Sequence, residues 1–416
     1  MAMNLNDAEQ AMLAGKMGPA RRQAIAQQIA VGQFFDAEDF VPVTQAHIMA
    51  DTESLGETGV TFLESLASLP EDQRRISIPT ITDPRGADFQ SYQRINHDPA
   101  YVELERRADR AFRALGVLMT DTCINYQTVM PPVRGEHLAM GDTGVVIYSN
   151  SVFGARTNYE GGPSALAAAL TGRTPRYGFH LDENRRGTRI FRIKDQPRDW
   201  SEWGALGGLI GRRMGSYFEV PVIEGVTQPP TSDDLKHFGA AMASFGSTAL
   251  FHMIGVTPEA PDTKSIFDGP PPQAEIIGSN AIEAFFGEYA MADDALDVVV
   301  FAAPQLSLFE LNRLAELLHG KRVHDAVSVI VATSPENKRA AERMGLDDKI
   351  TNAGAILLEG VCFYQMHARE LGEANGWRRL MTNSAKLANI IGGYGYEPVL
   401  ADMERCIASA VAGRIV

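Results

Sequence analysis

The stretch Val298-Val299-Val300-Phe301, followed by Ser307-Leu308-Phe309-Glu310, decides the fold class of this chain. A short run of apolar, mostly β-branched residues is typical of a buried strand. A serine followed three residues later by a glutamate is the capping box that begins a helix, and leucines then recur on one face as far as Gly320. We therefore predict a strand over 298–301, a loop over 302–306 and a helix that ends before Gly320.

The same alternation of short apolar runs and capped periodic segments extends along the chain. The further predicted strands are 117–119, 145–148, 327–331 and 356–358. The further predicted helices are 6–13, 99–115, 165–170, a segment that begins at Ser334-Pro335 and ends near Gly345, and a late helix around Cys406. Strands that alternate with helices indicate an α/β fold with mainly parallel sheets.

Composition excludes several classes of protein. The chain has 416 residues, 45% hydrophobic and 22% charged, which is ordinary for a globular protein with two or three cores. Its formal net charge of −14 argues against binding to nucleic acid or to an anionic membrane. The N-terminus has no basic region followed by an apolar run, and no segment approaches the roughly 18 apolar residues of a membrane helix. We expect a cytoplasmic protein with neither nucleic acid nor membrane as partner.

Two proline-rich stretches are candidate internal boundaries. They are Pro229 to Asp233 and Pro270-Pro271-Pro272. Prolines interrupt helices and central strands, so such runs mark loops. We expect seams near 229–233 and 270–272.

Three cysteines, Cys123, Cys362 and Cys406, are too few and too scattered for a disulfide framework. Cys123 and Cys362 each follow a predicted strand, and ligands of open α/β sheets bind beyond the carboxyl ends of strands. Each cysteine can equally be a small buried apolar residue, and no C-x-x-C spacing indicates a zinc or redox pair. Cys406 lies in the predicted late helix and is expected to be structural on this reasoning.

The polar residues that follow the predicted strand 145–148 are candidates for an anion site. They are Ser149, Asn150 and Ser151, and then Arg156, Thr157 and Asn158 in a glycine-rich segment. Arginine binds a carboxylate through two parallel hydrogen bonds, and glycines allow backbone N–H groups to approach. A solvated polar loop explains the same composition. His47, His137 and His180 lie in polar segments but are more often satisfied polar groups than ligands.

A family resemblance extends what the spacing indicates. The segment Tyr148 to Gly162 resembles the "NSV-x-GARTN-x-EGG" signature of aconitase X large subunits. Further stretches are similar to the same family, and these are 12–18, 41–47, 169–175, 178–185 and 381–386. The resemblance covers nearly the whole of 1–416 and corresponds to the catalytic large subunit, without the small swivelling domain.

The resemblance implies an aconitase-like catalytic core of several parallel-sheet subdomains around a metal site. Family members are hydro-lyases that dehydrate cis-3-hydroxy-L-proline in bacteria and mevalonate 5-phosphate in archaea. The implied partner is a small swivel-domain subunit in a heterodimer, which carries a serine as the catalytic base. The implied cofactor is iron or an iron–sulfur cluster, which acts as a Lewis acid on the departing hydroxyl group.

The metal ligands implied by the resemblance are only partly present. Cys123 and Cys362 match two cluster cysteines of the family. The third lies in a Gly-Cys-Pro-His loop that reads Ala302-Ala303-Pro304-Gln305 in this chain. We therefore expect a mononuclear iron or a [2Fe–2S] cluster ahead of a [4Fe–4S] cluster, with Cys406 as the substitute ligand.

The remaining site residues are assigned by role. The predicted catalytic residues are Ser149, Asn150, Ser151, Arg156, Thr157 and Lys386, with Arg156 as the clamp for the substrate carboxylate and Lys386 as a second cation. The predicted substrate-binding residues are His47, His137, Asn158, His180, Asn383 and Ser384.

The hypothesis that we put first is a hydro-lyase acting on cis-3-hydroxy-L-proline. Mevalonate 5-phosphate is the alternative substrate, and it requires more cationic groups near Arg156 than the sequence identifies. A divergent paralogue that has lost its cluster and only binds a small anion is favoured by Ala303 and Gln305. A nicotinamide oxidoreductase ranks lower because no G-x-G-x-x-G follows a predicted strand.

Overall fold

The computed structural model describes residues 3–416 of the chain. Within that range the strands form four sheets, three of which are wholly parallel. The fourth is the antiparallel pair of β1 (Phe40–Pro42) and β5 (Arg173–Pro175). The predicted α/β class is therefore confirmed.

The N-terminal part is built on a parallel sheet in the order β3-β2-β4. These strands are β2 (Ala46–Ile48), β3 (Thr80–Thr82) and β4 (Ala139–Met140). The surrounding helices are α1 (Asp7–Leu13), α2 (Pro19–Phe34), α3 (Thr52–Ala67), α4 (Glu71–Arg74), α5 (Pro99–Leu115), α6 (Thr143–Ser151) and α7 (Pro163–Thr171). Apolar side chains from α3, α5 and α7 pack with the strands in one buried core.

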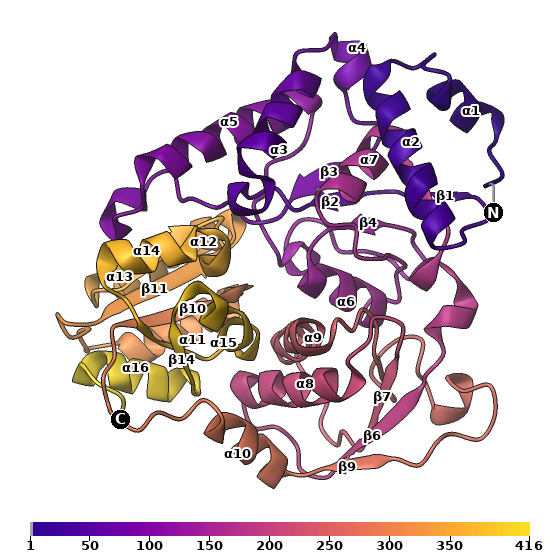
Figure 1. Cartoon of the computed structure of the whole chain (residues 1–416). Coiled ribbons are helices and arrows are strands. Elements are labelled where there is room, and N and C mark those ends of the chain that lie inside the picture. The colour runs from indigo at the N-terminus through magenta and orange to yellow at the C-terminus, as the bar shows by residue number, and fades with distance from the viewer. Residues whose placement is uncertain (1–2) are drawn as a thin grey trace.

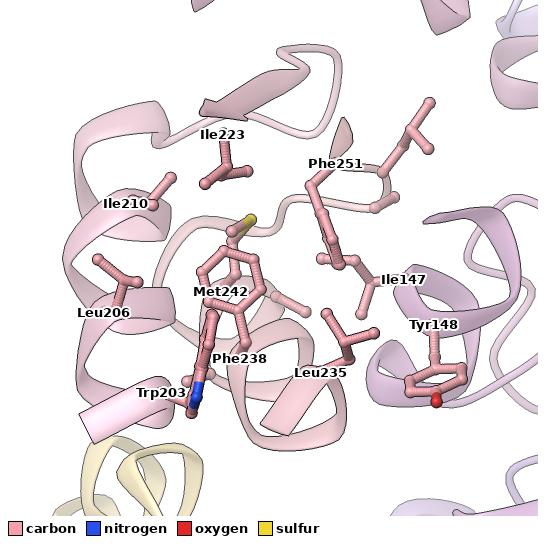
Figure 2. Packing of buried hydrophobic residues seen from close by; sticks show 14 of the residues in the cluster. Ile147, Tyr148, Trp203, Leu206, Ile210, Ile223, Leu235, Phe238, Met242 and Phe251 are labelled. Carbon is pink, nitrogen blue, oxygen red and sulfur yellow. The ribbon is translucent and has the colours of Figure 1, made fainter. Parts of the chain in front are cut away.

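The middle part holds a parallel sheet in the order β8-β7-β6-β9. Its strands are β6 (Arg189–Ile193), β7 (Pro221–Glu224), β8 (His252–Met253) and β9 (Glu275–Ile277), and its helices are α8 (Trp200–Met214), α9 (Ser232–Gly246) and α10 (Ser279–Gly287). Figure 2 shows Trp203, Phe238 and Met242 of α8 and α9 interdigitating with neighbouring residues of this core.

Helices α8 and α9 approach each other closely because glycines line their contact. A β-carbon added to Gly207 would lie 2.1 Å from the Phe238 carbonyl oxygen, and one added to Gly211 would lie 2.4 Å from the Met242 carbonyl oxygen. Any larger residue at these positions would push the helices apart. The glycines therefore allow α9 to lie directly against α8.

The C-terminal part is a five-stranded parallel sheet in the order β12-β11-β10-β13-β14. Its strands are β10 (Val298–Leu306), β11 (Ser328–Thr333), β12 (Ile356–Glu359), β13 (Arg379–Thr382) and β14 (Glu397–Leu400). Its helices are α11 (Leu308–Leu318), α12 (Pro335–Arg343), α13 (Leu346–Asn352), α14 (Ala368–Asn375), α15 (Ala385–Ile391) and α16 (Met403–Ala412). The chain leaves β10 toward one edge and returns to its other side at β13, so the switch point of the sheet lies between these two strands.

Figure 1 shows the three parts around a common centre, with the indigo-to-purple part at the top, the magenta part below it and the orange-to-yellow part beside both. Helices α6 and α15 both pack against α9 there. The centre is thus shared by all three parts of the chain.

Several expected elements are confirmed with their caps. The Asn6–Glu9 and Ser307–Glu310 capping boxes both form. Helix α5 begins after Asp98 and ends at Gly116, and α7 covers the predicted 165–170. The predicted strands at 298, 327 and 356 appear as β10, β11 and β12.

Three predictions of local structure are wrong. Residues 145–148 are helical within α6, because Asp142 caps the helix by accepting hydrogen bonds from the backbone N–H groups of Gly144 and Val145. Residues 117–119 contribute a single bridge at Leu118, which is 59% exposed and therefore not in a buried strand. The loop expected over 302–306 belongs to β10, with a register shift against β11 between Phe301 and Leu306.

The candidate seams stay predictions. Pro229 and Pro230 precede the capping residue of α9, Thr231, and Pro270–Pro272 lie between β8 and β9. In the part of the chain that is described, no helix is long and apolar enough to cross a membrane.

Candidate functional site

The candidate site lies where the carboxyl ends of two parallel sheets face each other. Asp83 directly follows β3, and Asp142 follows β4 after one glycine. From the five-stranded sheet, Gln305 is the last residue but one of β10, at the switch point, and Lys386 lies in the first turn of the helix after β13. Ligands of open α/β sheets bind at such ends, and here two sheets contribute to the same place.

Lys386 and Asp142 form the central ion pair. The Lys386 Nζ atom lies 3.3 Å from Asp142 Oδ1 and 3.5 Å from Thr143 Oγ1. Burial opposes charge on Lys386, but the negative charge of Asp142 and its neighbours outweighs it and raises the lysine pKa. Burial likewise opposes charge on Asp142, yet the charge of Lys386 and the hydrogen bond from a backbone N–H group hold its pKa low. The pair is therefore ionised at neutral pH.

Asp83 and His47 form a second, uncharged pair beside it. His47 Nε2 donates a hydrogen bond to the Thr122 carbonyl at 2.9 Å and lies 3.6 Å from Asp83 Oδ1. Burial lowers the pKa of His47, so its ring is neutral. Burial, and then the charge of Asp142, raise the pKa of Asp83 well above its usual value. Burial therefore favours the protonated form of Asp83 over the charged form.

A glutamine connects Asp83 to a second buried carboxyl group. Gln365 Nε2 donates to Asp83 Oδ2 at 3.0 Å and to Asp51 Oδ2 at 3.2 Å. Burial raises the pKa of Asp51 to about 6. One amide thus bridges two buried carboxyl groups, and within residues 3–416 neither of them forms an ion pair with a lysine or arginine.

The structure brings Cys123 and Cys362 to the same place. Burial and then the charges of Asp83 and Asp142 raise the pKa of Cys123 to about 12. Burial raises the pKa of Cys362, and the charge of Lys386 acts on both thiols in the opposite sense. Thiols in this state need a metal ion or a cation to become thiolates.

Cys406 does not join them. It lies in α16, in a separate apolar core with Met403 and Ile407, and its Sγ atom lies 3.9 Å from the Ala401 carbonyl oxygen. Burial raises its pKa. Its placement fits the structural role expected from its helix and gives no support to a role as substitute ligand.

The donor set fits a metal centre held by two thiols of this chain and does not fit one held by three. No group of three or more His, Cys, Asp or Glu side chains within residues 3–416 is arranged to hold a metal ion. Several buried polar atoms, among them those of His47, Asp83 and Gln305 at this site, have no hydrogen-bond partner in the described residues. They are His47 Nδ1, Asp83 Oδ1, both amide atoms of Asn125, Ser149 Oγ, Gln305 Oε1 and Asn383 Nδ2. Unsatisfied buried atoms are rare, so a group of them favours a bound ligand here.

Most residues of the 149–158 segment hold the backbone rather than face a ligand. Asn150 bonds the backbone of Thr157 and Ala249, and Ser151 Oγ accepts from the Phe251 N–H. Thr157 and Asn158 likewise bond main-chain groups of their surroundings. Their predicted direct roles in catalysis and binding stay predictions. The hydrogen bonds that their side chains form stabilise the surrounding backbone. Ser384 Oγ, which caps α15 and donates to the Ala303 carbonyl, acts in the same way.

Arg156 lies in a different environment from Lys386. Its guanidinium pairs with Asp182 and donates to the His180 carbonyl, and it lines a cleft of about 290 Å³. Three further arginines, Arg134, Arg185 and Arg186, line the same cleft. Arg156 therefore has cationic neighbours, which the sequence alone did not identify and which mevalonate 5-phosphate would require.

Two predicted histidines lie next to this cleft. His137 Nδ1 and His180 Nδ1 are 2.9 Å apart, and His180 is buried. Burial, and then the charge of His137, lower the pKa of His180 to about 3. Burial and then Arg156 lower the pKa of His137. Both rings are neutral and act as hydrogen-bonding groups.

The sequence reasoning missed Asp83, Asp142 and Gln365. Asp142 carried a signal, because Asp142-Thr143-Gly144 has the form of a helix N-cap. Asp83 follows a three-residue strand that no periodicity marks. Gln365 is a single amide in an irregular segment, and no local signal identifies it.

Comparisons with known proteins cover nearly the whole chain. Family models described as aconitase X first, second and third domain match residues 2–183, 187–286 and 296–412. The phosphomevalonate dehydratase large subunit of Methanothermobacter thermautotrophicus is 34% identical over 94% of this chain and 94% of its own length. The cis-3-hydroxy-L-proline dehydratase of Pseudomonas aeruginosa is 32% identical over 98% of this chain and 70% of its own length.

A solved structure has the same fold. The holo-form of Thermococcus kodakaraensis aconitase X is 29% identical, with a TM-score of 0.87, over 98% of this chain and 100% of its own. The boundaries between the matched segments separate the three sheets described above. The centre that those sheets enclose is therefore built jointly by all three segments.

Proposed function

This chain belongs to the aconitase X family of dehydratases, and from that premise we propose that it is the large subunit of a hydro-lyase that removes water from a small hydroxy acid. As substrate we put cis-3-hydroxy-L-proline first. The observation that carries the proposal is the convergence of two buried thiols, a buried ammonium and a protonated carboxyl group, drawn from the first and third matched segments.

Lys386 supplies the cation for the substrate carboxylate. Its ammonium is ionised in a buried site, where an anion gains far more from a positive charge than in solution. Asp142 keeps the lysine protonated and oriented. Loss of the α-proton places further negative charge on the carboxylate, which the same ammonium stabilises.

Asp83 supplies a proton. Its unpartnered Oδ1 atom and its raised pKa fit a neutral carboxyl group that protonates a departing hydroxyl group. His47 keeps its Nδ1 atom free as an acceptor, because its Nε2 atom is bonded to Thr122. Iron on Cys123 and Cys362 would supply Lewis-acid assistance to the same carbon–oxygen cleavage.

The partner in this proposal is a small subunit. Curated relatives of nearly the same length carry the words "large subunit" in their names. The base that removes the α-proton is assigned to that partner, so we assign it to no residue of this chain. A heterodimer, a cytoplasmic location and an iron–sulfur centre stay predictions.

Mevalonate 5-phosphate is the second candidate substrate, and the arginine cleft favours it. Arg134, Arg156, Arg185 and Arg186 line the cleft, against the carboxylates of Asp182 and Glu259. Arg134 has no hydrogen-bond or ion-pair partner within residues 3–416. Arginine forks match phosphate geometry, so this lining suits the phosphate group of a phosphorylated acid.

Turnover by the reconstituted complex tests the proposal. We expect the anaerobically purified chain, loaded with iron and mixed with its small subunit, to convert one of the two hydroxy acids. Pyrroline-carboxylate formation reports hydroxyproline dehydration, and mass spectrometry reports loss of water from mevalonate 5-phosphate. An iron-loaded complex that binds either acid but converts neither would support the alternative of a paralogue that only binds a small anion.

A further inference from the structure

Gln305 joins the two loops that carry the candidate metal ligands. It is fully buried at the end of β10. Its backbone N–H donates to Cys123 Sγ at 3.4 Å. Its side-chain Nε2 donates to the Asp121 carbonyl at 3.1 Å and to the Val361 carbonyl at 3.2 Å.

These contacts join Gln305 to both cysteine loops. Asp121 is two residues before Cys123, and Val361 directly precedes Cys362. Both N–H donors of the amide are therefore used to hold one carbonyl from each cysteine loop. A buried carbonyl that loses its hydrogen-bond partner cannot replace it with water, and this is costly. The two hydrogen bonds therefore favour one arrangement of the loops.

Gln305 is itself fixed from the side of α9. Lys236 Nζ donates to the Gln305 carbonyl at 3.2 Å and lies 3.1 Å from Asp233 Oδ1. It also pairs with Glu310, which closes the capping box of α11. The lysine side chain is 0% exposed, and its neighbours raise its pKa against the effect of burial. The backbone of Gln305 is thus anchored between α9 and α11.

We propose that Gln305 is a positioning residue that sets the spacing and orientation of the Cys123 and Cys362 thiols for one shared metal ion. The inference rests on the proposed function only in taking these thiols to bind a metal. In this chain the loop 302–305 contributes no thiol and no imidazole of its own. It contributes instead the Gln305 side-chain amide, which is hydrogen-bonded to both cysteine loops, and the Gln305 backbone N–H group, which donates to Cys123 Sγ. Outer hydrogen bonds of this kind orient ligands and tune a metal site.

Anaerobic Co²⁺ titration of the full metal-free chain tests the proposal. Co²⁺ bound to thiolates gives a sulfur-to-metal charge-transfer band, so the band reports binding at the cysteines without any turnover. We expect the band in the unaltered protein and in Cys406→Ser, and its loss or marked weakening in Cys123→Ser and Cys362→Ser. Gln305→Ala should weaken Co²⁺ binding about 10–100-fold, the usual effect of removing an outer-shell partner.

Gln28→Ala is the matched control. Gln28 is also a buried glutamine, with hydrogen bonds to the Arg173 carbonyl and to Thr171, but it lies in α2 away from the cysteines. Its loss should lower stability by a similar amount and leave Co²⁺ affinity unchanged. If Gln305→Ala gives no folded protein, Gln305→Asn replaces it, because the shorter side chain cannot reach both carbonyl groups.

Three results would overturn the inference. They are unchanged Co²⁺ affinity in the Gln305 variant, equal weakening in the Gln28 control, and a Co²⁺ band that survives both cysteine substitutions. A chain that binds Co²⁺ through both thiols yet dehydrates neither hydroxy acid would contradict the proposed function and leave the positioning role intact.

Discussion

The Nζ atom of Lys386 lies 3.3 Å from Oδ1 of Asp142, although the two residues are 244 positions apart in the sequence. Their side chains are 4% and 3% exposed. A buried charge without its partner is costly. The first and third parts of the chain are therefore tied together at the candidate site by an ion pair that neither part can satisfy alone.

Lys386→Met should destabilise the protein and abolish turnover. It leaves Asp142 charged and buried without a counterion, which typically costs about 3–5 kcal/mol. Urea unfolding measures the loss. Arg75→Ala, which removes an exposed pair with Glu71, serves as the control and should change stability little. A Lys386→Met protein as stable as the unaltered one would show that the pair contributes nothing.

Asp83→Asn should separate stability from activity. Because the folded-state pKa of Asp83 is raised, its stabilising contribution is present below the unfolded pKa and is lost as pH rises through the folded pKa. Asparagine does not titrate, so the variant should match or exceed the original in stability at pH 8. Turnover should fall about 10²–10⁴-fold if Asp83 donates a proton. Unaltered turnover would remove Asp83 from the mechanism.

Glu160→Gln should flatten the pH dependence of stability. Burial raises the pKa of Glu160 from 4.5 to about 7, and Thr174 is its hydrogen-bonding partner. The stability that this group contributes is therefore present below pH 4.5 and is lost as pH rises through about 7, by about 3 kcal/mol in total. Urea unfolding at pH 5 and pH 8 measures the difference. The exposed Glu71→Gln is the control, and an equal pH slope in Glu160→Gln and the original would contradict the shift.

Ala303→Cys should change the metal centre. Ala303 is fully buried, its carbonyl bonds Ser384, and it stands where the resemblance places a third cysteine. We expect more iron per chain after anaerobic reconstitution and a stronger visible absorption, because a third thiolate completes the set for a larger cluster. Ala302→Cys, one residue earlier in the same strand, is the control. Identical iron content in both variants and the original would exclude position 303 as a ligand position.

Arg134→Ala should discriminate between the two candidate substrates. An arginine–phosphate hydrogen bond contributes about 1.5–3 kcal/mol, so its loss should raise KM for mevalonate 5-phosphate about 10–100-fold. Turnover of cis-3-hydroxy-L-proline should not change. The control is Arg322→Ala, an exposed arginine elsewhere on the surface. Equal effects on both substrates would show that the arginine cleft does not bind phosphate.

The α/β alternation after residue 298 could be predicted from sequence because local signals there agree with the fold. The Ser307–Glu310 capping box and the apolar run at 298 both form as expected. The helical structure of the apolar run at 145–148 could not be predicted from local sequence. Helix α6 is buried on every side, so no polar face marks a helical period. Its capping residue Asp142 was the only local indication of a helix.

The site could be predicted only in outline. Family resemblance led to both Cys123 and Cys362, and position after a strand holds for Cys362 alone, because residues 117–119 form no buried strand. The structure places the two cysteines near each other. The carboxyl groups of Asp83 and Asp142 depend on the meeting of two sheets, which no local pattern encodes. The role of Asn150 and Thr157 in stabilising the backbone also depends on tertiary hydrogen bonds. The sequence motif is the same whether such a side chain contacts a ligand or the backbone, so the motif alone does not distinguish the two roles.

The pairing of Asp142 with a residue of α15 also sets an order of events during synthesis on the ribosome. Asp142 leaves the exit tunnel long before Lys386, which follows it by 244 residues. Until α15 emerges, a nascent chain that packs Asp142 into its core would trap a lone charge. The N-terminal part therefore completes its own packing only after α15 has been synthesised, and a product terminated before Lys386 should be recognised as unfinished by the proteases that remove such chains.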